Sequence, residues 1–345
     1  MAKMNTYIDD IQRIFHKDLP WENLSGKNIL ITGATGLIGS TLVEALMANP
    51  CRDYVVYASG RNLQRVQKRF ETYLSMDSFH FLKHDVVLPF QDDIQFDFII
   101  HAASNASPKA FSCNPVEIVK ANIYGVSNLI EYGITHGMQR FLYVSSGEVY
   151  GEGDGRIISE EYSGYVNCLN PRSCYPSSKR TSETLCASYA YEYGADIVIA
   201  RPCHIYGPNF TENDNRVYAQ FIRNILKGEN IVMKSTGEQL RSWCYVVDCV
   251  SALLYILLKG ESGEAYNIAD PNSVITIKQL AEMLATIGKS KVIVDTPSGT
   301  EKHGYNPVSK SVFSVDKLQG LGWKVCESMN KKMTRTVMHL QKINL

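Results

Sequence analysis

The chain lacks several features that would assign it to particular classes of protein. It has no run of about 18 consecutive apolar residues, the length that a membrane-spanning helix needs. Basic and acidic residues balance at 35 each, so no net charge favours a nucleic acid partner. The N-terminal residues lack the apolar segment of a signal peptide. We therefore expect no membrane span, no nucleic acid partner and a cytoplasmic location.

Cysteine is present but forms no metal-binding or disulfide pattern. The nine cysteines are an odd number and are scattered, with no Cys-x-x-Cys pair. Structural metal sites and disulfide frameworks need cysteines at close, paired spacings. We therefore expect neither a metal site nor disulfides, and a reducing cytosol suits such a chain.

Short apolar segments alternate with helical patterns over the first two thirds of the chain. Strands are expected at residues 28–32, 53–58, 79–84, 96–101, 140–145 and 197–201, and helices at 37–47, 63–74, 115–136 and 171–193. Such alternation is typical of a parallel sheet covered by helices on both faces. The predicted fold is α/β, a Rossmann-type doubly wound parallel sheet with a smaller, interleaved C-terminal substrate-binding region.

Three regions follow from this pattern. Residues 1–26 read as a helical lead-in, residues 27–201 as the dinucleotide-binding domain and residues 202–345 as mainly the substrate-binding region. In the last region, helices are expected at 217–227 and 276–287. The lead-in places Ile8, Ile11, Ile14 and Phe15 on one face. We expect that face to pack on the domain rather than to form an oligomer contact.

A glycine-rich turn joins the first predicted strand to the first predicted helix. Gly33, Gly36 and Gly39 are spaced Gly-x-x-Gly-x-x-Gly, which differs from the generic Gly-x-Gly-x-x-Gly. Glycine allows a tight turn and close approach of a pyrophosphate, and the helix N-terminus offers N–H groups to the anion. We predict a dinucleotide site here, the alternative being an ordinary glycine-rich turn.

Tyr175 and Lys179 lie four residues apart in the predicted helix 171–193. At that spacing the two side chains share one side of the helix, one turn apart. The lysine ammonium can then lower the pKa of the phenol toward a value useful for proton transfer near neutrality. The pair suits an enzyme that removes a hydroxyl proton while hydride leaves the same carbon, although the spacing alone also occurs by chance.

Further motifs follow one another along the chain. They are His84-Asp85-Val86, His101-Ala102-Ala103, residues 145–151, Arg201-Pro202, Tyr206-Gly207-Pro208 and residues 241–246. With the glycine turn and the Tyr–Lys pair they resemble the extended short-chain dehydrogenase/reductase family, also described as NAD-dependent epimerases and dehydratases. Within it, Ala106-Ser107-Pro108, residues 172–175 and Arg216-Val217 are most similar to the UDP-glucuronate decarboxylases (UDP-xylose synthases).

The resemblance implies a set of cofactor contacts. They are Thr32, Gly33, Thr35, Gly36, Leu37, Ile38 and Gly39 around the pyrophosphate, Asp85 and Val86 at the adenine, Ala102, Ala103 and Ser104 beneath the cofactor, and Tyr175 and Lys179.

The second predicted strand leaves the choice between NAD and NADP open. Such a strand usually ends in an acid that binds the ribose hydroxyls of NAD, but here it ends Ser59-Gly60-Arg61. No acid repels a 2′-phosphate, and Arg61 could pair with one, which favours NADP on physical grounds. The family likeness favours NAD, which we expect.

The resemblance also implies catalytic roles. Tyr175 would take the proton of the sugar C4 hydroxyl, Lys179 would hold the phenolate and the nicotinamide ribose, and Ser146 would bond the same oxygen. Glu148 would position the sugar acid or water in a decarboxylase, or abstract the C5 proton in a dehydratase. Its neighbour is Gly147, where dehydratases have Asp and decarboxylases usually have Ser. Loss of water needs a proton donor, so this neighbour argues against dehydration.

Three residues are candidate substrate contacts. Arg241 is expected near the nucleotide diphosphate or a sugar carboxylate, because its planar fork suits both. Arg216 is a second candidate for the diphosphate. His204 is either a substrate contact or a packed core histidine.

The function expected from these residues is NAD-dependent modification of a nucleotide sugar, favouring a UDP-sugar, through oxidation at C4. Decarboxylation of UDP-glucuronate is the best interpretation, because a β-keto acid loses carbon dioxide easily. The alternatives are a 4-epimerase, an NADP-dependent 4-keto-sugar reductase, a 4,6-dehydratase and a non-enzymatic NAD(P)-binding regulator. A homodimer is expected by family likeness alone.

Overall fold

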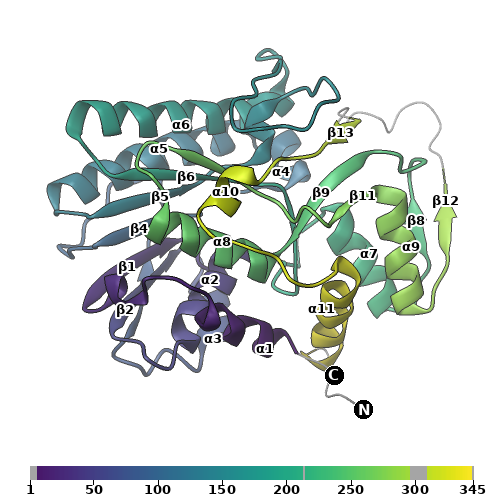
Figure 1. Cartoon of the computed structure of the whole chain (residues 1–345), viewed down its shortest axis with the longest axis horizontal. Coiled ribbons are helices and arrows are strands. Elements are labelled where there is room, and N and C mark those ends of the chain that lie inside the picture. Colours follow the sequence, from purple (N-terminus) through teal and green to yellow (C-terminus); the bar gives the residue numbers. More distant parts are fainter. Residues whose placement is uncertain (1–5, 213, 296–308, 344–345) are drawn as a thin grey trace.

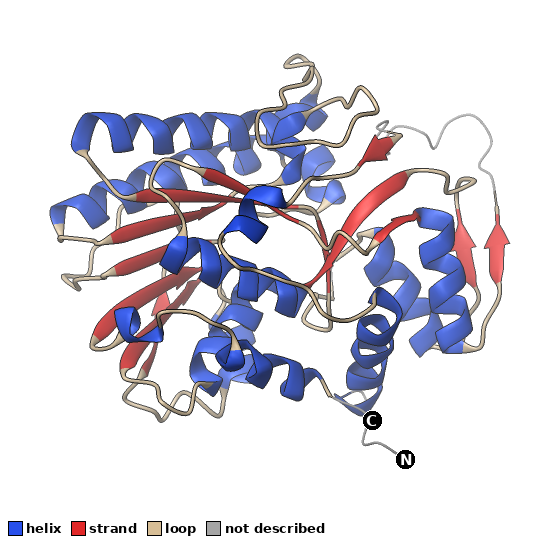
Figure 2. Ribbon diagram, in the orientation of Figure 1, coloured by secondary structure: helices blue, strands red, loops and turns tan. Residues whose placement is uncertain are grey.

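The structure is a computed structural model that describes residues 6–212, 214–295 and 309–343. A large sheet covered by helices on both faces forms most of it, and two smaller sheets lie to one side (Figures 1 and 2). The strand order of the large sheet is β10-β6-β5-β4-β1-β2-β3, and every neighbouring pair is parallel. The predicted fold class is therefore confirmed.

The strands of the large sheet agree closely with those expected from the sequence, except that the edge strand β10 was not expected. They are β1 (Lys27–Thr32), β2 (Tyr54–Gly60), β3 (Phe79–Lys83), β4 (Phe98–His101), β5 (Arg140–Val144), β6 (Ile197–Pro202) and β10 (Ala265–Ile268). The chain runs outward from β1 to β2 and β3 on one side and to β4, β5 and β6 on the other. The carboxyl ends of β1 and β4 thus flank the point where the winding reverses, which is where open α/β sheets bind ligands.

Helices bury the two faces of this sheet separately. One face carries α5 (Pro115–Thr135) and α6 (Cys174–Tyr193), and the other carries α2 (Leu37–Ala48) and α8 (Val246–Lys259) (Figure 1). In β1, Ile29 and Ile31 pack in the α2 and α8 core, while Leu30 packs in the α5 and α6 core. Because both faces of β1 are buried, these three residues form an unbroken apolar run.

The remaining elements surround this framework. The helices are α1 (Tyr7–Gln12), α3 (Leu63–Phe70), α4 (Pro108–Cys113), α7 (Val217–Leu226), α9 (Ile277–Gly288), α10 (Asp316–Gly320) and α11 (Met329–Ile343). The 3₁₀ segments are η1 (Arg13–His16), η2 (Trp21–Leu24), η3 (Gly147–Tyr150) and η4 (Pro171–Ser173). The smaller sheets contain β7 (His204–Tyr206), β9 (Leu240–Tyr245), β11 (Val274–Thr276) and β13 (Lys310–Ser311), and β8 (Ile231–Met233) and β12 (Val292–Val294).

The later part of the chain contributes to both halves of the molecule. Strand β10 hydrogen bonds to β6 in the large sheet, and α8 covers one face of that sheet. Strand β7 pairs with β9 beside it. The division at residues 201 and 202 stays a prediction. None of the helices in the described parts of the chain is long and apolar enough to cross a membrane.

The N-terminal lead-in packs on the domain. Tyr7 donates a hydrogen bond to Glu44 of α2 at 2.5 Å, and Asn209 donates one to the Tyr7 oxygen at 2.8 Å. Ile11 and Ile14 are buried as expected, but Ile8 is 59% exposed and Tyr7 occupies the core in its place. The expected common face is therefore wrong at Ile8, because the buried face follows Tyr7, Ile11 and Ile14, and Ile8 lies about a quarter of a turn away from it.

A buried lysine ties α11 to the rest of the molecule. Lys332 is 2% exposed, and its Nζ lies 2.7 Å from the Asp248 carboxylate of α8 and 3.2 Å from that of Asp270, which follows β10. Asp270 is fully buried. The ammonium of Lys332 compensates the charges of the two carboxylates. Removing it leaves two buried carboxylates without a cation, which is unfavourable.

We expect Lys332→Met to lower the free energy of unfolding by about 3–5 kcal/mol, the usual cost of breaking a buried ion pair. Urea denaturation measures this directly. The neighbouring exposed Lys331→Met is the matched control and should change stability by less than about 1 kcal/mol. Equal losses in both variants would contradict the structural role of the buried lysine.

Candidate active site

The glycine turn between β1 and α2 has the geometry of a pyrophosphate cradle. Gly33 has a φ of +67°, and a Cβ there would lie 2.7 Å from the Ala102 carbonyl oxygen. A Cβ on Gly39 would overlap the Gly33 carbonyl oxygen. Gly36 is the N-cap residue of α2, whose first turn begins with Leu37 and Ile38. Since the first turn of a helix leaves N–H groups unbonded, the turn fits the pyrophosphate of a dinucleotide.

Below this turn a buried histidine joins β1 to β4. Thr32 Oγ1 lies 2.7 Å from Nδ1 of His101, and the Ala103 amide donates to Thr32 Oγ1 at 3.4 Å. Burial, and to a smaller extent the nearby Lys179, lower the pKa of His101 to about 3. The imidazole is therefore neutral and serves to hold the ends of β1 and β4 together.

The loop after β4 is connected to α6 by a chain of hydrogen bonds. Ser104 donates to Asn122 Oδ1 of α5 at 2.8 Å, and Asn122 Nδ2 donates to Ser178 Oγ of α6 at 2.8 Å. Ser178 in turn donates to the Cys174 carbonyl at 2.5 Å. Sequence reasoning missed Asn122, whose only signal is a polar residue at a buried position of an otherwise apolar helix face.

Tyr175 and Lys179 meet at the carboxyl end of β5. They are 6% and 2% exposed, respectively. The Tyr175 ring stacks on Phe111 of α4 with 4.7 Å between the ring centroids. Lys179 Nζ donates to the Val144 carbonyl at 2.8 Å and lies 5.8 Å from the centroid of the Tyr175 ring.

The pKa values in the protein alone differ from the sequence expectation. Burial, the largest cause, and the Glu148 carboxylate together raise the pKa of Tyr175 to about 12, although the Ser146 hydroxyl acts to lower it. Burial also lowers the pKa of Lys179 to about 7. Lys179 therefore does not bring the phenol toward neutrality here, because removing both groups from water outweighs their attraction.

Ser146 and Glu148 lie near Tyr175, at the 3₁₀ turn η3 that follows β5. Ser146 Oγ accepts a hydrogen bond from the Glu148 amide at 3.2 Å, which caps η3. The Glu148 carboxylate accepts two hydrogen bonds from Arg172, at 2.8 Å and 2.9 Å. The Arg172 guanidinium lies 4.9 Å from the centroid of the Phe111 ring, on which Tyr175 also stacks. Phe111 thus helps to position both groups: it stacks on the Tyr175 ring, and it contacts the arginine that holds the Glu148 carboxylate.

Sequence reasoning used Arg172 only as a mark of kinship and missed its contact with the site. The available signal was its position three residues before Tyr175, which places both near the same end of one helical segment.

The three candidate substrate residues gather near the same point. The Arg216 guanidinium lowers the pKa of Tyr175, and Arg216 pairs with Asp214 through an Nε–Oδ1 hydrogen bond of 2.9 Å. Arg241 is 4% exposed, and burial lowers its pKa while the Glu148 carboxylate raises it. Burial lowers the pKa of His204 to about 4, with Arg241 as a further cause. Strand pairing of β7 with β9 brings these last two residues together.

At the adenosine end, Arg61 follows β2 and is already paired. Its Nη1 lies 3.1 Å from a carboxylate oxygen of Glu117 on α5 and 3.6 Å from one of Asp85. Val86 is buried, and its carbonyl accepts a hydrogen bond from Asn128 of α5 at 2.9 Å. Sequence reasoning missed Glu117, which lies 56 positions after Arg61.

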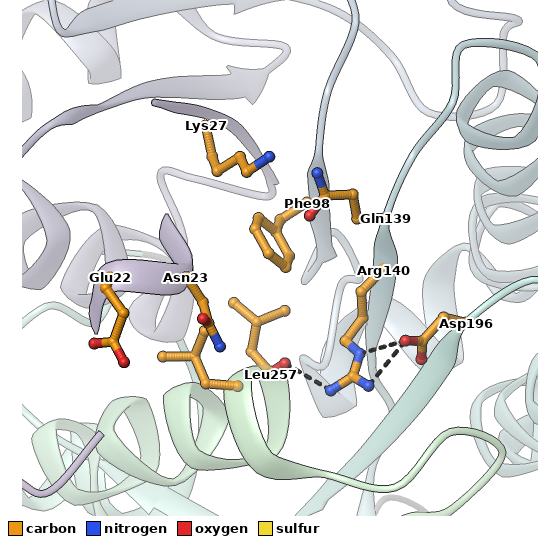
Figure 3. A pocket seen from close by; sticks show the side chains of 9 residues that line it. Glu22, Asn23, Lys27, Phe98, Gln139, Arg140, Asp196 and Leu257 are labelled. Carbon is orange, nitrogen blue, oxygen red and sulfur yellow. Dashed lines mark hydrogen bonds and ion pairs between the residues drawn. The ribbon is translucent and has the colours of Figure 1, made fainter. Parts of the chain in front are cut away.

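A separate cavity of about 390 Å³ lies at the opposite end of the sheet (Figure 3). Its lining includes Lys27, Phe98 and Arg140, the first residues of β1, β4 and β5. Arg140 donates to Asp196 and to the Leu257 carbonyl there. This cavity is remote from the carboxyl ends of the strands and is not the site described above. Among the residues that the structure describes, no His, Cys, Asp and Glu side chains group together to hold a metal ion.

A dinucleotide cradle and a buried Tyr–Lys pair at the carboxyl edge of one parallel sheet define a nucleotide-dependent enzyme. Residues 29–269 match the model of the NAD dependent epimerase/dehydratase family. The chain belongs to this family.

Individual relatives agree with that assignment. The chain is 30% identical to UDP-glucuronic acid decarboxylase 1 of Xenopus tropicalis, over 99% of this chain and 80% of that protein. It is 36% identical to UDP-glucuronic acid decarboxylase 5 of Arabidopsis thaliana, over 87% of this chain and 85% of that protein. Among solved structures, a UDP-glucose 4-epimerase from Thermotoga maritima, determined with UDP-glucose, is 25% identical with a TM-score of 0.77, covering 92% of this chain and 100% of that one.

The lowered pKa of Lys179 makes stability depend on pH. The folded protein releases this proton near pH 7, whereas the unfolded chain keeps it up to about 10.5. The unfolded state therefore binds more protons between those values, and stability rises with pH over that window. Lys179→Met removes this dependence.

We expect Lys179→Met, measured without cofactor, to gain stability relative to the native protein most strongly at pH 6. The difference should shrink toward pH 10 by as much as about 1.4 kcal/mol per unit of pH. Thermal or urea unfolding at several pH values provides the comparison, and exposed Lys120→Met is the control. Parallel pH curves for Lys179→Met and the native protein would contradict the burial of a depressed-pKa amine.

Proposed function

We propose that this protein decarboxylates UDP-glucuronate through transient oxidation at the sugar C4. The observation that carries this proposal is that Tyr175 is buried near Ser146, whose hydroxyl lowers the pKa of the phenol, and near a carboxylate that Arg172 holds. The names of the relatives that match nearly the whole chain support the same reaction.

The chain's own residues have distinct tasks in this proposal. NAD, when bound, supplies the hydride acceptor for C4 and, after carbon dioxide has left, the hydride donor. Tyr175 takes the proton of the C4 hydroxyl and returns it at the end. Ser146 bonds the same oxygen, and Lys179 stabilises the phenolate once it has formed. The enclosed position keeps water away from the ketone.

Loss of carbon dioxide needs a ketone next to the carbon that bears the carboxylate, and little further protein chemistry. The electrons left at C5 pass into the C4 carbonyl to form an enolate, and C5 then takes a proton from a bound water as the ketone forms again. Glu148, bound at both oxygens by Arg172, is suited to positioning the sugar. Arg241 is buried, and the Glu148 carboxylate is close enough to raise its pKa. The planar guanidinium of Arg241 is suited to binding the sugar carboxylate.

Gly147 supports decarboxylation over dehydration. A 4,6-dehydration expels hydroxide and needs a proton donor beside the C5 base. The position next to Glu148 has no side chain to supply one. A 4-epimerase is the second candidate, favoured by the likeness to the Thermotoga maritima UDP-glucose 4-epimerase.

We also propose NAD rather than NADP as the cofactor. Two features favoured a 2′-phosphate, the missing acid at the end of β2 and Arg61, but Arg61 is paired with the acids Glu117 and Asp85. Two carboxylates around one guanidinium leave the adenosine end with a net negative charge. A 2′-phosphate would meet repulsion there, whereas ribose hydroxyls would meet acceptors.

The homodimer and the cytoplasmic location stay predictions. For a dimer, α5 and α6 offer a continuous helical surface with exposed Val116, Tyr124, Tyr191 and Tyr193. Exposed aromatic residues of this kind are enriched at interfaces between proteins.

Incubation with UDP-glucuronate should give a UDP-sugar lighter by one carbon dioxide, detected by mass spectrometry. Tyr175→Phe should abolish this turnover, because phenylalanine cannot take the C4 proton. Tyr191→Phe, on the same helix but 94% exposed, should retain native activity. An unchanged substrate mass with altered stereochemistry would instead establish the epimerase, and turnover by Tyr175→Phe would refute the proposed base.

Direct titration should show that the native protein binds NAD more tightly than NADP. Glu117→Gln should shift the ratio of the two dissociation constants toward NADP by about threefold, the size expected for one exposed charge. Glu131→Gln, the same change elsewhere on α5, is the control and should leave the ratio unchanged. Tighter binding of NADP by the native protein would contradict the proposal, and equal ratios in both variants would remove Glu117 from it.

A further inference from the structure

Gly147 in the catalytic turn has no room for a side chain. A Cβ built on it would lie 2.6 Å from Cζ and 3.1 Å from Cε2 of Phe313. Real side chains do not approach so closely, so the end of the Phe313 ring occupies the place of a side chain at position 147. The backbone there does not require glycine, because Gly147 is not among the glycines with positive φ.

Phe313 is anchored on several sides. It is 5% exposed, and its amide donates to Ser242 Oγ at 3.1 Å, one residue after Arg241 on β9. The residues on either side of it pair with Ile158, through hydrogen bonds of 2.8 Å and 2.9 Å between backbone atoms. Its ring lies 5.5 Å from that of Tyr150 at the end of η3. The ring is therefore fixed against the turn that carries Ser146 and Glu148.

We propose that Phe313 is a positioning residue of the catalytic turn, whose ring holds Ser146 against Tyr175 and keeps a proton-donating side chain out of position 147. This inference rests on the proposed C4 oxidation. A glycine flanked by two site residues is free to move unless something packs on it. The Phe313 ring supplies that contact. Its loss would matter because a small displacement of a reacting group lowers the rate of reaction strongly.

The arrangement also gives a structural reason for glycine at position 147. A larger residue there and a phenylalanine at 313 exclude each other, so the two positions form one unit. The site keeps Ser146 for the sugar oxygen and Glu148 for positioning, and Phe313 fills the space between them with an apolar ring.

The test compares Phe313→Ala, Phe313→Leu, Gly147→Ala and the double variant Gly147→Ala/Phe313→Ala. Phe313→Ala should lower kcat between about tenfold and a hundredfold with little change in KM, since the turn loses its support while the binding residues remain. Phe313→Leu should recover most of the rate. Gly147→Ala alone should be impaired, and the double variant should be less impaired than the product of the two single effects.

The pH profile separates positioning from simple packing. The hydrogen bond with Ser146 lowers the pKa of Tyr175, so a displaced Ser146 should move the acid limb of the kcat profile to higher pH. Phe313→Ala should show this shift and Phe313→Leu should not. Val315→Ala, a truncation in the same buried cluster, should lower the melting temperature without moving the profile.

Two results would overturn the inference. One is a Phe313→Ala variant that is folded and binds cofactor with native kcat and pH profile. The other is strict additivity of Gly147→Ala and Phe313→Ala in thermal unfolding, which can be measured even if UDP-glucuronate is not the substrate. Failure of the native protein to release carbon dioxide would count against the proposed function alone, and the kinetic comparison would then use the sugar that it does convert.

Discussion

The site depends on keeping a phenol and an amine out of water within one turn of α6. Tyr175 is enclosed between Phe111, Ser146 and the arginines that lower its pKa, and Lys179 donates a hydrogen bond to the Val144 carbonyl. Burial of an amine is unfavourable, which is why its pKa falls to about 7. The fold tolerates this cost because the large sheet and its two apolar cores supply the stability. Because both groups are buried, a charged or polar ligand bound beside them would change their pKa values strongly.

The later half of the chain completes a site that the first half only begins. The glycine turn, the buried His101 and the α6 pair all come from the predicted dinucleotide region. Arg241 and His204 arrive on β9 and β7, and Phe313 backs the catalytic turn from a segment far along the chain. Each of these contacts joins residues distant in sequence, so the rigidity of the site depends on the packing of both halves.

The sequence predicted those helices and strands in which buried and exposed residues follow a regular pattern. The glycine turn was predictable because Gly33 needs a positive φ and a close backbone approach, and β1 because both its faces are apolar. Helix α8 was missed because nearly all of its residues are buried, which erases the 3.6-residue periodicity. The pairing of Arg61 with Glu117, the contact of Arg172 with Glu148 and the exclusion of a side chain at Gly147 by Phe313 arise from tertiary packing. No local pattern encodes them.

The most direct test of the central claim follows hydrogen at the sugar C4. A single turnover of UDP-glucuronate carrying deuterium at C4, on NAD-loaded protein, should proceed more slowly than with the unlabelled sugar. It should pass through transient reduced-nicotinamide absorbance and return deuterium to C4 of the product. A rate that is insensitive to the label, with no transient reduction of the cofactor, would contradict oxidation at C4 and with it the role assigned to Tyr175.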